Sequence, residues 1–332
     1  MSEKKLRWGV ISTSNIGRVA VNPAIQASSN GELVAVASRT AEAAQAFAEK
    51  EGIPRAYGSY EALLDADDID AIYNPLPNSL HLEWSIKAAG KGKHILCEKP
   101  LALDSAQCLE MEAAAKANGV KLMEAFMYRF HPRTQRVLEM VREGAIGDLK
   151  QIHSSFTFPL SRPDNIRWDP ELGGGALMDV GCYCVNVGRT LVGAEPLEVR
   201  AMANWHSTGV DAQLAGSLLF DGGVLVHFDC ALTMERTEVY QVLGTTGHLK
   251  VQKAFLPGTD AALIEHFDAN DQLTTHSVEG ADEYRLMVEH FADCALNDLP
   301  LRYTAEEAAS NMRVIEALYA SARKDGAEVE VG

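Results

Sequence analysis

Near its amino terminus the chain reads Gly9-Val10-Ile11-Ser12-Thr13-Ser14-Asn15-Ile16-Gly17. The apolar residues predict a buried β-strand, and the small residues after them predict a tight turn into a helix. The spacing is that of G-x-G-x-x-G, the loop that binds a dinucleotide pyrophosphate, with serine at the first two glycine positions. Serine lets backbone N–H groups approach a phosphate and adds a hydroxyl donor. An ordinary βα turn of small residues is the alternative. The candidate cofactor contacts of this loop are Ser12, Thr13, Ser14, Asn15 and Ile16.

Short apolar runs and helical patterns alternate from residue 6 to residue 126. Such alternation predicts a parallel sheet with helices on both faces, so we expect a Rossmann domain over residues 1–126. In its first crossover helix, Pro23 predicts a kink or interruption after Asn22, because proline has no N–H to donate. The predicted strands are 7–11, 33–37, 71–74, 94–97 and 121–126, and the predicted helices are 40–51, 79–89 and 105–118.

The pattern changes after a predicted helix at residues 132–143. Alternating apolar and polar stretches then predict an open, largely antiparallel sheet. We expect residues 127–332 to form an α+β domain that dimerises through this sheet, with C-terminal helices at 282–296 and 304–324 that pack back toward the Rossmann domain. The predicted strands are 149–158, 198–204, 213–220, 224–231, 238–243 and 261–267.

The composition excludes several classes of function. The chain has 332 residues and a formal net charge of −16, which disfavours nucleic acid and anionic membranes as partners. No apolar stretch approaches the roughly 20 residues of a membrane helix, and the amino terminus has no signal-peptide pattern, so we expect a cytoplasmic protein. The six cysteines lack the spacing of a zinc site, so we expect reduced thiols and no metal.

The end of the second predicted strand bears on the choice of cofactor. It reads Ala37-Ser38-Arg39-Thr40, where an NAD enzyme usually has an acidic residue for the ribose hydroxyls. Arg39 offers a fork for a 2′-phosphate, and Ser38 and Thr40 offer hydroxyl donors. This favours NADP over NAD. A solvated arginine before the next helix is the alternative.

The next strand that carries chemistry ends in Asn74-Pro75-Leu76-Pro77-Asn78-Ser79-Leu80-His81. The prolines fix a loop, and loops at the carboxyl ends of parallel strands line the ligand crevice of such sheets. A structural role for the histidine is an equal alternative. The candidate cofactor contacts here are Pro75, Leu76, Asn78 and His81.

A lysine and a tyrosine far apart in sequence are the candidate catalytic pair. Lys99, in Cys97-Glu98-Lys99-Pro100, follows an apolar strand, and Tyr183 follows a glycine run at 173–175. A lysine ammonium lowers the pKa of a nearby phenol and makes it a proton-transfer group. Asp179 lies four residues before Tyr183 and shares its helix face. An ordinary core helix with an aromatic residue is the alternative for the second peptide.

Together these peptides resemble the glucose-fructose oxidoreductase, inositol dehydrogenase and MocA family, in its aldose dehydrogenase, dihydrodiol dehydrogenase and glucose-fructose oxidoreductase branch. The resemblance spans the chain as far as Asn311 to Leu318. It is carried by Leu6-Arg7-Trp8-Gly9-Val10-Ile11, Cys97-Glu98-Lys99-Pro100-Leu101-Ala102, Met123-Glu124-Ala125-Phe126-Met127-Tyr128-Arg129-Phe130-His131-Pro132, Asn165-Ile166-Arg167-Trp168 and the segment from Gly173 to Tyr183.

The resemblance implies a Rossmann domain followed by an α/β domain whose open sheet lines the substrate site and mediates dimerisation. It implies that Lys99, with Glu98, faces the nicotinamide and the substrate oxygen. It also implies that Tyr183 is the catalytic acid or base, with Asp179 as the neighbouring carboxylate. Some members have histidine in place of this tyrosine, so its substrate-specific role stays open.

We therefore expect an NADP-dependent sugar oxidoreductase that converts the C1 hydroxyl of a pyranose aldose to a lactone and forms a dimer or tetramer. Arg129, Arg167 and Trp168 are candidates to orient the sugar or the nicotinamide. Alternatives with the same cofactor are an aldose-aldose oxidoreductase with tightly bound NADP, a dihydrodiol dehydrogenase, and an anhydro-sugar or dicarbonyl reductase. A non-catalytic NADP-binding regulator is the alternative of another class.

Overall fold

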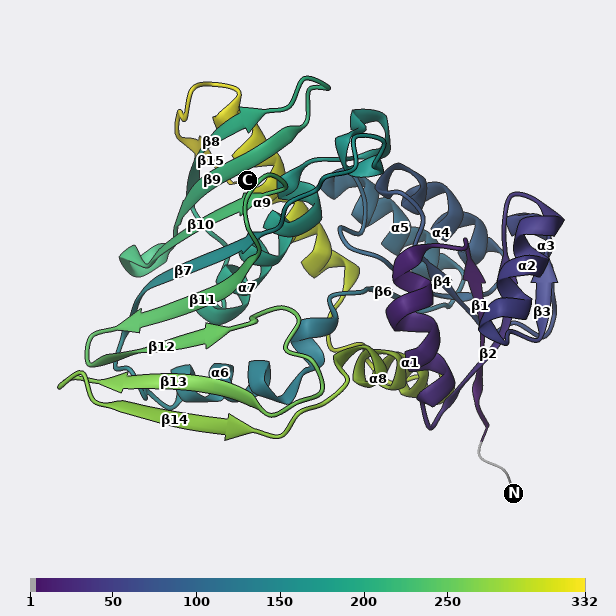
Figure 1. Ribbon diagram of the computed structural model, residues 1–332, viewed down its shortest axis with the longest axis horizontal. Coiled ribbons are helices and arrows are strands. Elements are labelled where there is room, and N and C mark those ends of the chain that lie inside the picture. The colour runs from purple at the N-terminus through teal and green to yellow at the C-terminus, as the bar shows by residue number, and fades with distance from the viewer. Residues whose placement is uncertain (1–3, 332) are drawn as a thin grey trace. The chain divides into compact units, whose positions relative to one another are not determined.

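The computed structural model describes residues 4–331 and divides the chain into two compact units (Figure 1). The first unit holds the chain up to Met127 and the segment Asp282–Ala309. The second holds Tyr128–Ala281 and the chain from Ser310 onward. Among residues 4–331, no helix has the length and apolar character needed to cross a bilayer.

The first unit is built on a six-stranded sheet in the order β3-β2-β1-β4-β5-β6. Every neighbouring pair is parallel, which confirms the predicted Rossmann sheet. The strand order reverses between β1 and β4, the place where such sheets bind ligands outside the carboxyl ends of their strands. The strands are β1 (Leu6–Ile11), β2 (Gly31–Ala37), β3 (Arg55–Tyr57), β4 (Ala71–Asn74), β5 (His94–Cys97) and β6 (Leu122–Glu124).

Helices cover this sheet and bury its apolar residues. Helix α8, from the late part of the chain, packs against β1, and the ring of Phe291 lies 5.3 Å from that of Trp8. Both side chains are fully buried. The helices of the unit are α1 (Asn22–Ala27), α2 (Ala41–Glu51), α3 (Tyr60–Leu64), the 3₁₀ turn η2 (Asn78–Leu80), α4 (His81–Gly90), α5 (Ser105–Ala117) and α8 (Glu283–Asn297).

The first crossover helix differs from the prediction. It contains a π-helical turn, η1 (Gly17–Val21), and continues as α1 beyond Pro23. The N–H of Asn22 donates to the carbonyl of Gly17, five residues back. The expected interruption after Asn22 was wrong, because Pro23 lies in the first turn of α1, where its missing N–H is tolerated.

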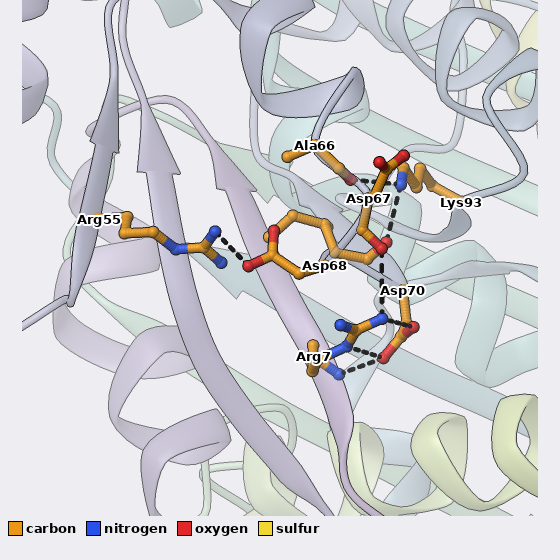
Figure 2. Close-up of polar contacts among 8 residues, drawn as sticks. Arg7, Arg55, Ala66, Asp67, Asp68, Asp70 and Lys93 are labelled. Carbon is orange, nitrogen blue, oxygen red and sulfur yellow. Dashed lines mark hydrogen bonds and ion pairs between the residues drawn. The ribbon is translucent and has the colours of Figure 1, made fainter.

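The amino-terminal edge of the sheet is held by ion pairs (Figure 2). Arg7 at the start of β1 donates from Nε and Nη2 to both carboxylate oxygens of Asp70, at 2.9 and 2.7 Å. Arg55 pairs with Asp68 in the same turn. Lys93 Nζ donates to two backbone carbonyls of this turn at 2.7 and 2.8 Å. These contacts stabilise the turn before β4 at the amino-terminal edge of the sheet. The candidate site residues of this unit lie at the opposite, carboxyl edge.

The second unit contains a nine-stranded sheet in the order β14-β13-β12-β11-β7-β10-β9-β8-β15. Only β7 and β10 pair in parallel, so the prediction of a largely antiparallel sheet is confirmed. The strands are β7 (Leu149–Thr157), β8 (Glu198–Trp205), β9 (Asp211–Leu219), β10 (Leu225–Ala231), β11 (Thr237–Gly244), β12 (Gly247–Gln252), β13 (Ala262–Asp268), β14 (Leu273–Val278) and β15 (Val329–Glu330).

Helices of the second unit pack on one face of this sheet, α7 against β7 and β10 and α6 against β13 and β14. The opposite face exposes alternate side chains of the strands, among them Met202, Leu263 and Leu273 at 73%, 50% and 52%. His153 and Asp229 lie on the same face. The helical segments that complete the chain are η3 (Met127–Phe130), α6 (Pro132–Arg142), η4 (Ile166–Trp168), η5 (Pro170–Leu172), η6 (Leu177–Gly181), α7 (Cys182–Val192), η7 (Asp221–Gly223) and α9 (Ala305–Ala322).

Candidate active site

The loop after β1 has the backbone that a phosphate-binding turn requires. Ser12 has φ = 106°, a conformation that favours glycine and explains why the motif usually has glycine there. Ser14 Oγ accepts the N–H of Gly17 at 3.1 Å. A Cβ at Gly17 would lie 3.0 Å from that oxygen, so the third glycine of the motif is retained for close packing. Thr13 and Ile16 are half-buried, and Asn15 is exposed.

The end of β2 presents three polar residues in different ways. Ser38 is buried and its N–H donates to the carbonyl of Tyr57 at 3.1 Å. Thr40 Oγ1 accepts the N–H of Ala43 at 3.2 Å and so caps α2. Arg39, between them, is exposed. Its guanidinium is thus available at the carboxyl edge, next to a helix amino terminus that favours anions.

The side chain of His81, which is fully buried, contacts the backbone of the loop after β4. Its Nε2 lies 2.8 Å from the carbonyl oxygen of Leu76 and its Nδ1 lies 3.0 Å from that of Pro100. Burial lowers the pKa of His81 to about 4, against the opposing effect of these carbonyls. Both ring nitrogens therefore face backbone, and His81 supports the loop from within. Pro75 and Leu76 are buried in the same loop, and Asn78 is half-buried at the start of η2.

Glu98 and Lys99 leave the carboxyl end of β5 half-exposed. Glu98 Oε1 accepts the hydroxyl of Tyr73 at 2.6 Å, and Oε2 lies 3.3 Å from the N–H of Lys99. Burial, and then the charge of Glu98, raise the pKa of Tyr73 well above its ordinary value, so this phenol stays a donor. Tyr73 was missed from the sequence because its role depends on β4 pairing with β5.

In the second unit, a glycine run begins the helix that carries Asp179 and Tyr183. Gly175 donates its N–H to the carbonyl of Arg167 at 2.9 Å. A Cβ on Gly174 would lie 2.4 Å from that carbonyl oxygen, so only glycine fits. The helix opens with the π-helical turn η6, which carries Asp179, and continues as α7, which carries Tyr183. Single π turns of this kind are frequent at functional sites.

Arg167 and Asp179 are in direct contact, which the sequence did not predict. Arg167 Nε donates to Asp179 Oδ2 at 2.5 Å, and the two side chains are 37% and 14% exposed. The next residue, Trp168, stacks on the ring of His206 at 4.4 Å and 22°. His206 comes from the turn between β8 and β9 and had no recognisable signal in the sequence. The second unit thus brings three of the predicted residues together with one that was missed.

Tyr183 lies in a cluster of aromatic rings and is 5% exposed. Its ring centroid is 5.2 Å from that of Phe255, 5.4 Å from Phe156 and 5.8 Å from Tyr128. The Tyr128 hydroxyl donates to Asn186 Oδ1 at 2.6 Å, one turn along α7. Arg129, beside Tyr128 in η3, is 6% exposed. This packing fixes the tyrosine ring and limits the access of water to it.

Two family models match successive parts of the chain. A family described as "Oxidoreductase family, NAD-binding Rossmann fold" matches residues 6–126, and the "GFO/IDH/MocA C-terminal domain" matches residues 134–250. The D-xylose 1-dehydrogenase (NADP(+)) 2 of Haloferax volcanii is 40% identical over 327 residues, 98% of this chain and 100% of the relative.

Two solved structures extend the comparison to the whole fold. A 3-ketoreductase from Actinomadura kijaniata, in complex with NADP and TDP-benzene, has a TM-score of 0.91 and 31% identity over 96% of this chain and 98% of its own. An aldose-aldose oxidoreductase from Caulobacter crescentus, complexed with glycerol, has a TM-score of 0.89 and 28% identity over 98% and 100% of the two chains.

Proposed function

The chain belongs to the GFO/IDH/MocA family of NAD(P)-dependent sugar oxidoreductases, and on that premise we propose that it oxidises the C1 hydroxyl of a pyranose aldose to a lactone with NADP. One observation carries this proposal: a buried tyrosine lies one helical turn from a carboxylate that is held by an arginine. The kinship with a D-xylose 1-dehydrogenase supports the choice of an aldose.

The residues at the carboxyl edge of the first unit fit an NADP molecule. Ser12 already has the left-handed backbone of a phosphate loop, and the amino terminus of the helix after it favours anions. We propose that Arg39 binds the 2′-phosphate, since it is exposed beside the capped start of α2. When bound, NADP supplies a nicotinamide ring that accepts a hydride from the substrate carbon.

Tyr183 is the proposed general base. In its phenolate form, its oxygen takes the proton of the C1 hydroxyl, and the rings of Phe156, Phe255 and Tyr128 keep its orientation fixed during the transfer. Lys99 is the proposed electrostatic partner, whose ammonium stabilises the developing alkoxide. Glu98, anchored by Tyr73, fixes the peptide that leads into Lys99.

Asp179 is the proposed sugar-orienting residue. The guanidinium of Arg167 engages its Oδ2 at 2.5 Å and sets the direction of the carboxylate. A carboxylate held in this way accepts hydrogen bonds from sugar hydroxyls in a defined geometry. We propose that Trp168 and Arg129 also help to orient the sugar or the nicotinamide.

We further propose that the protein is at least a dimer that forms through the open face of the nine-stranded sheet, and that it acts in the cytoplasm. Met202 on β8, and Leu263 and Leu273 on β13 and β14, are large apolar side chains exposed toward opposite edges of that face, and exposed apolar side chains favour association. The polar pair His153 and Asp229 on the same face supplies groups for hydrogen bonds across an interface.

A substrate panel tests the proposed activity. Purified protein is incubated with NADP⁺ and D-xylose, other pyranose aldoses or a trans-dihydrodiol. It is also incubated with NADPH and a dicarbonyl or a nucleotide-linked keto-sugar, and the absorbance of the reduced nicotinamide is followed in each case. We expect the aldoses to react and NMR to identify the lactone. Turnover of only the diol or the keto-sugar would replace the proposed substrate class. Tight NADP binding without any turnover would indicate a regulator.

A further inference from the structure

Asp211, the first residue of β9, is buried with 0% exposure. Its Oδ2 accepts the backbone N–H of Leu177 at 2.7 Å, and its Oδ1 accepts the hydroxyl of Tyr319 at 2.7 Å. Leu177 is the first residue of η6, the turn that precedes Tyr183 in the chain. The carboxylate therefore joins a strand, the start of this helix and helix α9.

Gly175 makes room for this carboxylate. Its φ is 122°, and a Cβ on it would lie 2.2 Å from Asp211 Oδ1 and 2.9 Å from the Tyr319 hydroxyl. A side chain here would thus displace the carboxylate or the phenol. The same residue accepts the N–H of Asp179 at 3.0 Å through its carbonyl. The glycine run of the sequence therefore allows a buried anion to approach the helix amino terminus.

The amino terminus of the helix that begins with η6 favours a negatively charged group. The first N–H groups of a helix have no partner within the helix, and the helix dipole favours negative charge there. The helix has no side-chain cap of its own at Ala176. Burial raises the pKa of Asp211 to about 6, and the hydrogen bonds from Tyr319 and Leu177 act in the opposite direction. Asp211 is therefore mostly ionised at neutral pH.

We propose that Asp211 is a positioning residue that anchors the helix bearing Asp179 and Tyr183, and that Tyr319 fixes Asp211 in turn. Asp179 lies two residues after the anchored N–H and is also held by Arg167. Loss of the anchor lets the first turn shift, and Asp179 and Tyr183 shift with it. Because a small misplacement of catalytic groups costs rate strongly, the effect falls on the chemical step. This inference rests on the proposed function for the roles of these two residues.

Asp211→Asn and Tyr319→Phe test the anchor, since both keep the shape of the side chain. For Asp211→Asn we expect kcat to fall about tenfold to a hundredfold, as for a lost charge-assisted hydrogen bond, with the Kd for NADP unchanged. The deuterium isotope effect at C1 should rise because the chemical step becomes slower. Tyr319→Phe should show the same changes to a smaller extent. A loss of thermal stability with kcat and the isotope effect unchanged would overturn the proposal.

Hydrogen exchange without substrate separates the anchor from the proposed activity. Amides of residues 176–183 should exchange faster in Asp211→Asn than in the wild type, while those of β7 and β10 keep their rates. Asp221→Asn is the matched control, because Asp221 is exposed in the turn after the same strand. Unchanged exchange over residues 176–183 would overturn the anchor whatever the substrate. Faster exchange in a protein that oxidises no aldose would contradict the proposed function and leave the anchor standing.

Discussion

The guanidinium of Arg167 donates to Asp179 at 2.5 Å, across twelve positions of the sequence. A glycine run lies between the two residues in the sequence. Gly174 packs so closely against the carbonyl of Arg167 that a Cβ would not fit there. Both residues were candidates from the sequence, Asp179 as the carboxylate beside Tyr183 and Arg167 as a contact of the sugar or the nicotinamide. The structure shows that Arg167 holds the carboxylate of Asp179. This contact fixes the direction of the carboxylate, as the proposed sugar-orienting role requires.

Removing this clamp should impair sugar binding more than folding. We expect Arg167→Ala to raise the KM for the aldose about tenfold and to lower kcat, because Asp179 loses its fixed direction. The Kd for NADP, measured by fluorescence titration, should separate a sugar role from a nicotinamide role. Arg162→Ala is the matched control, since the Arg162 and Asp164 side chains are 71% and 74% exposed. Equal kinetic losses in both variants would contradict the clamp.

Arg39 should select the cofactor. Arg39→Ala removes the fork that we assign to the 2′-phosphate, so affinity for NADP should fall about tenfold or more while affinity for NAD changes little. Calorimetric titration with each cofactor measures this difference. Lys50→Ala, at the other end of α2, serves as the control for a lost surface charge. Equal losses of affinity for both cofactors would refute the assignment.

The ion pair between Arg7 and Asp70 should make stability depend on pH. Burial opposes ionisation of Asp70, but the hydrogen bonds and charge of Arg7 lower its pKa below the ordinary value. The stabilisation is then full above about pH 5 and is lost as the pH falls through the lowered pKa. Asp70→Asn should reduce the free energy of unfolding by about 1 kcal/mol at neutral pH, since the pair is partly exposed.

Urea unfolding at a series of pH values checks this prediction. The difference between wild type and Asp70→Asn should narrow as the pH falls below the ordinary aspartate pKa of about 3.9, and it should be lost once the pH is below the lowered pKa of the native carboxyl. Asp164→Asn, in an exposed pair, should have little effect at any pH. A difference that stays constant down to acidic pH would mean that shape, and not charge, stabilises this edge.

The open sheet face should govern assembly. Wild-type protein at micromolar concentration should sediment as a dimer or a larger oligomer, and Leu263→Asp should shift it toward monomer because a charge is buried without a partner. Leu109→Asp, at an exposed position of α5, should leave the oligomer intact. Wild-type protein that sediments as a monomer would contradict the proposed dimer.

Much of the fold follows from local pattern. The apolar runs at Val10 and Ile95 predicted buried parallel strands, and the alternation along 213–220 predicted a strand with one covered face. β14 was missed because none of its residues is fully buried, so no alternation marks it. β3 has three residues, all half-buried, which is too short for any periodicity.

The candidate site was predictable where one peptide carries the chemistry and not where several peptides meet. Lys99 and Tyr183 lie in peptides whose residues suggest a role. The contribution of Tyr73 depends on a strand that pairs with β5, and that of Asp211 depends on a strand that begins beside a helix distant in the sequence. The sequence made His81 a candidate cofactor contact. In the structure its side chain is buried, and both ring nitrogens contact backbone carbonyl oxygens.

The measurement that tests this account most directly is a double-mutant cycle of turnover on Lys99 and Tyr183. Tyr183→Phe removes the oxygen that accepts the proton and Lys99→Met removes the charge, so each should lower kcat about a hundredfold to ten-thousandfold with NADP affinity retained. Lys91→Met, on the exposed surface, controls for the loss of a lysine. We predict that the double variant is little slower than the slower single variant, because the two groups serve one proton transfer. Fully additive losses, or near-normal turnover in Tyr183→Phe, would show that another group moves the proton.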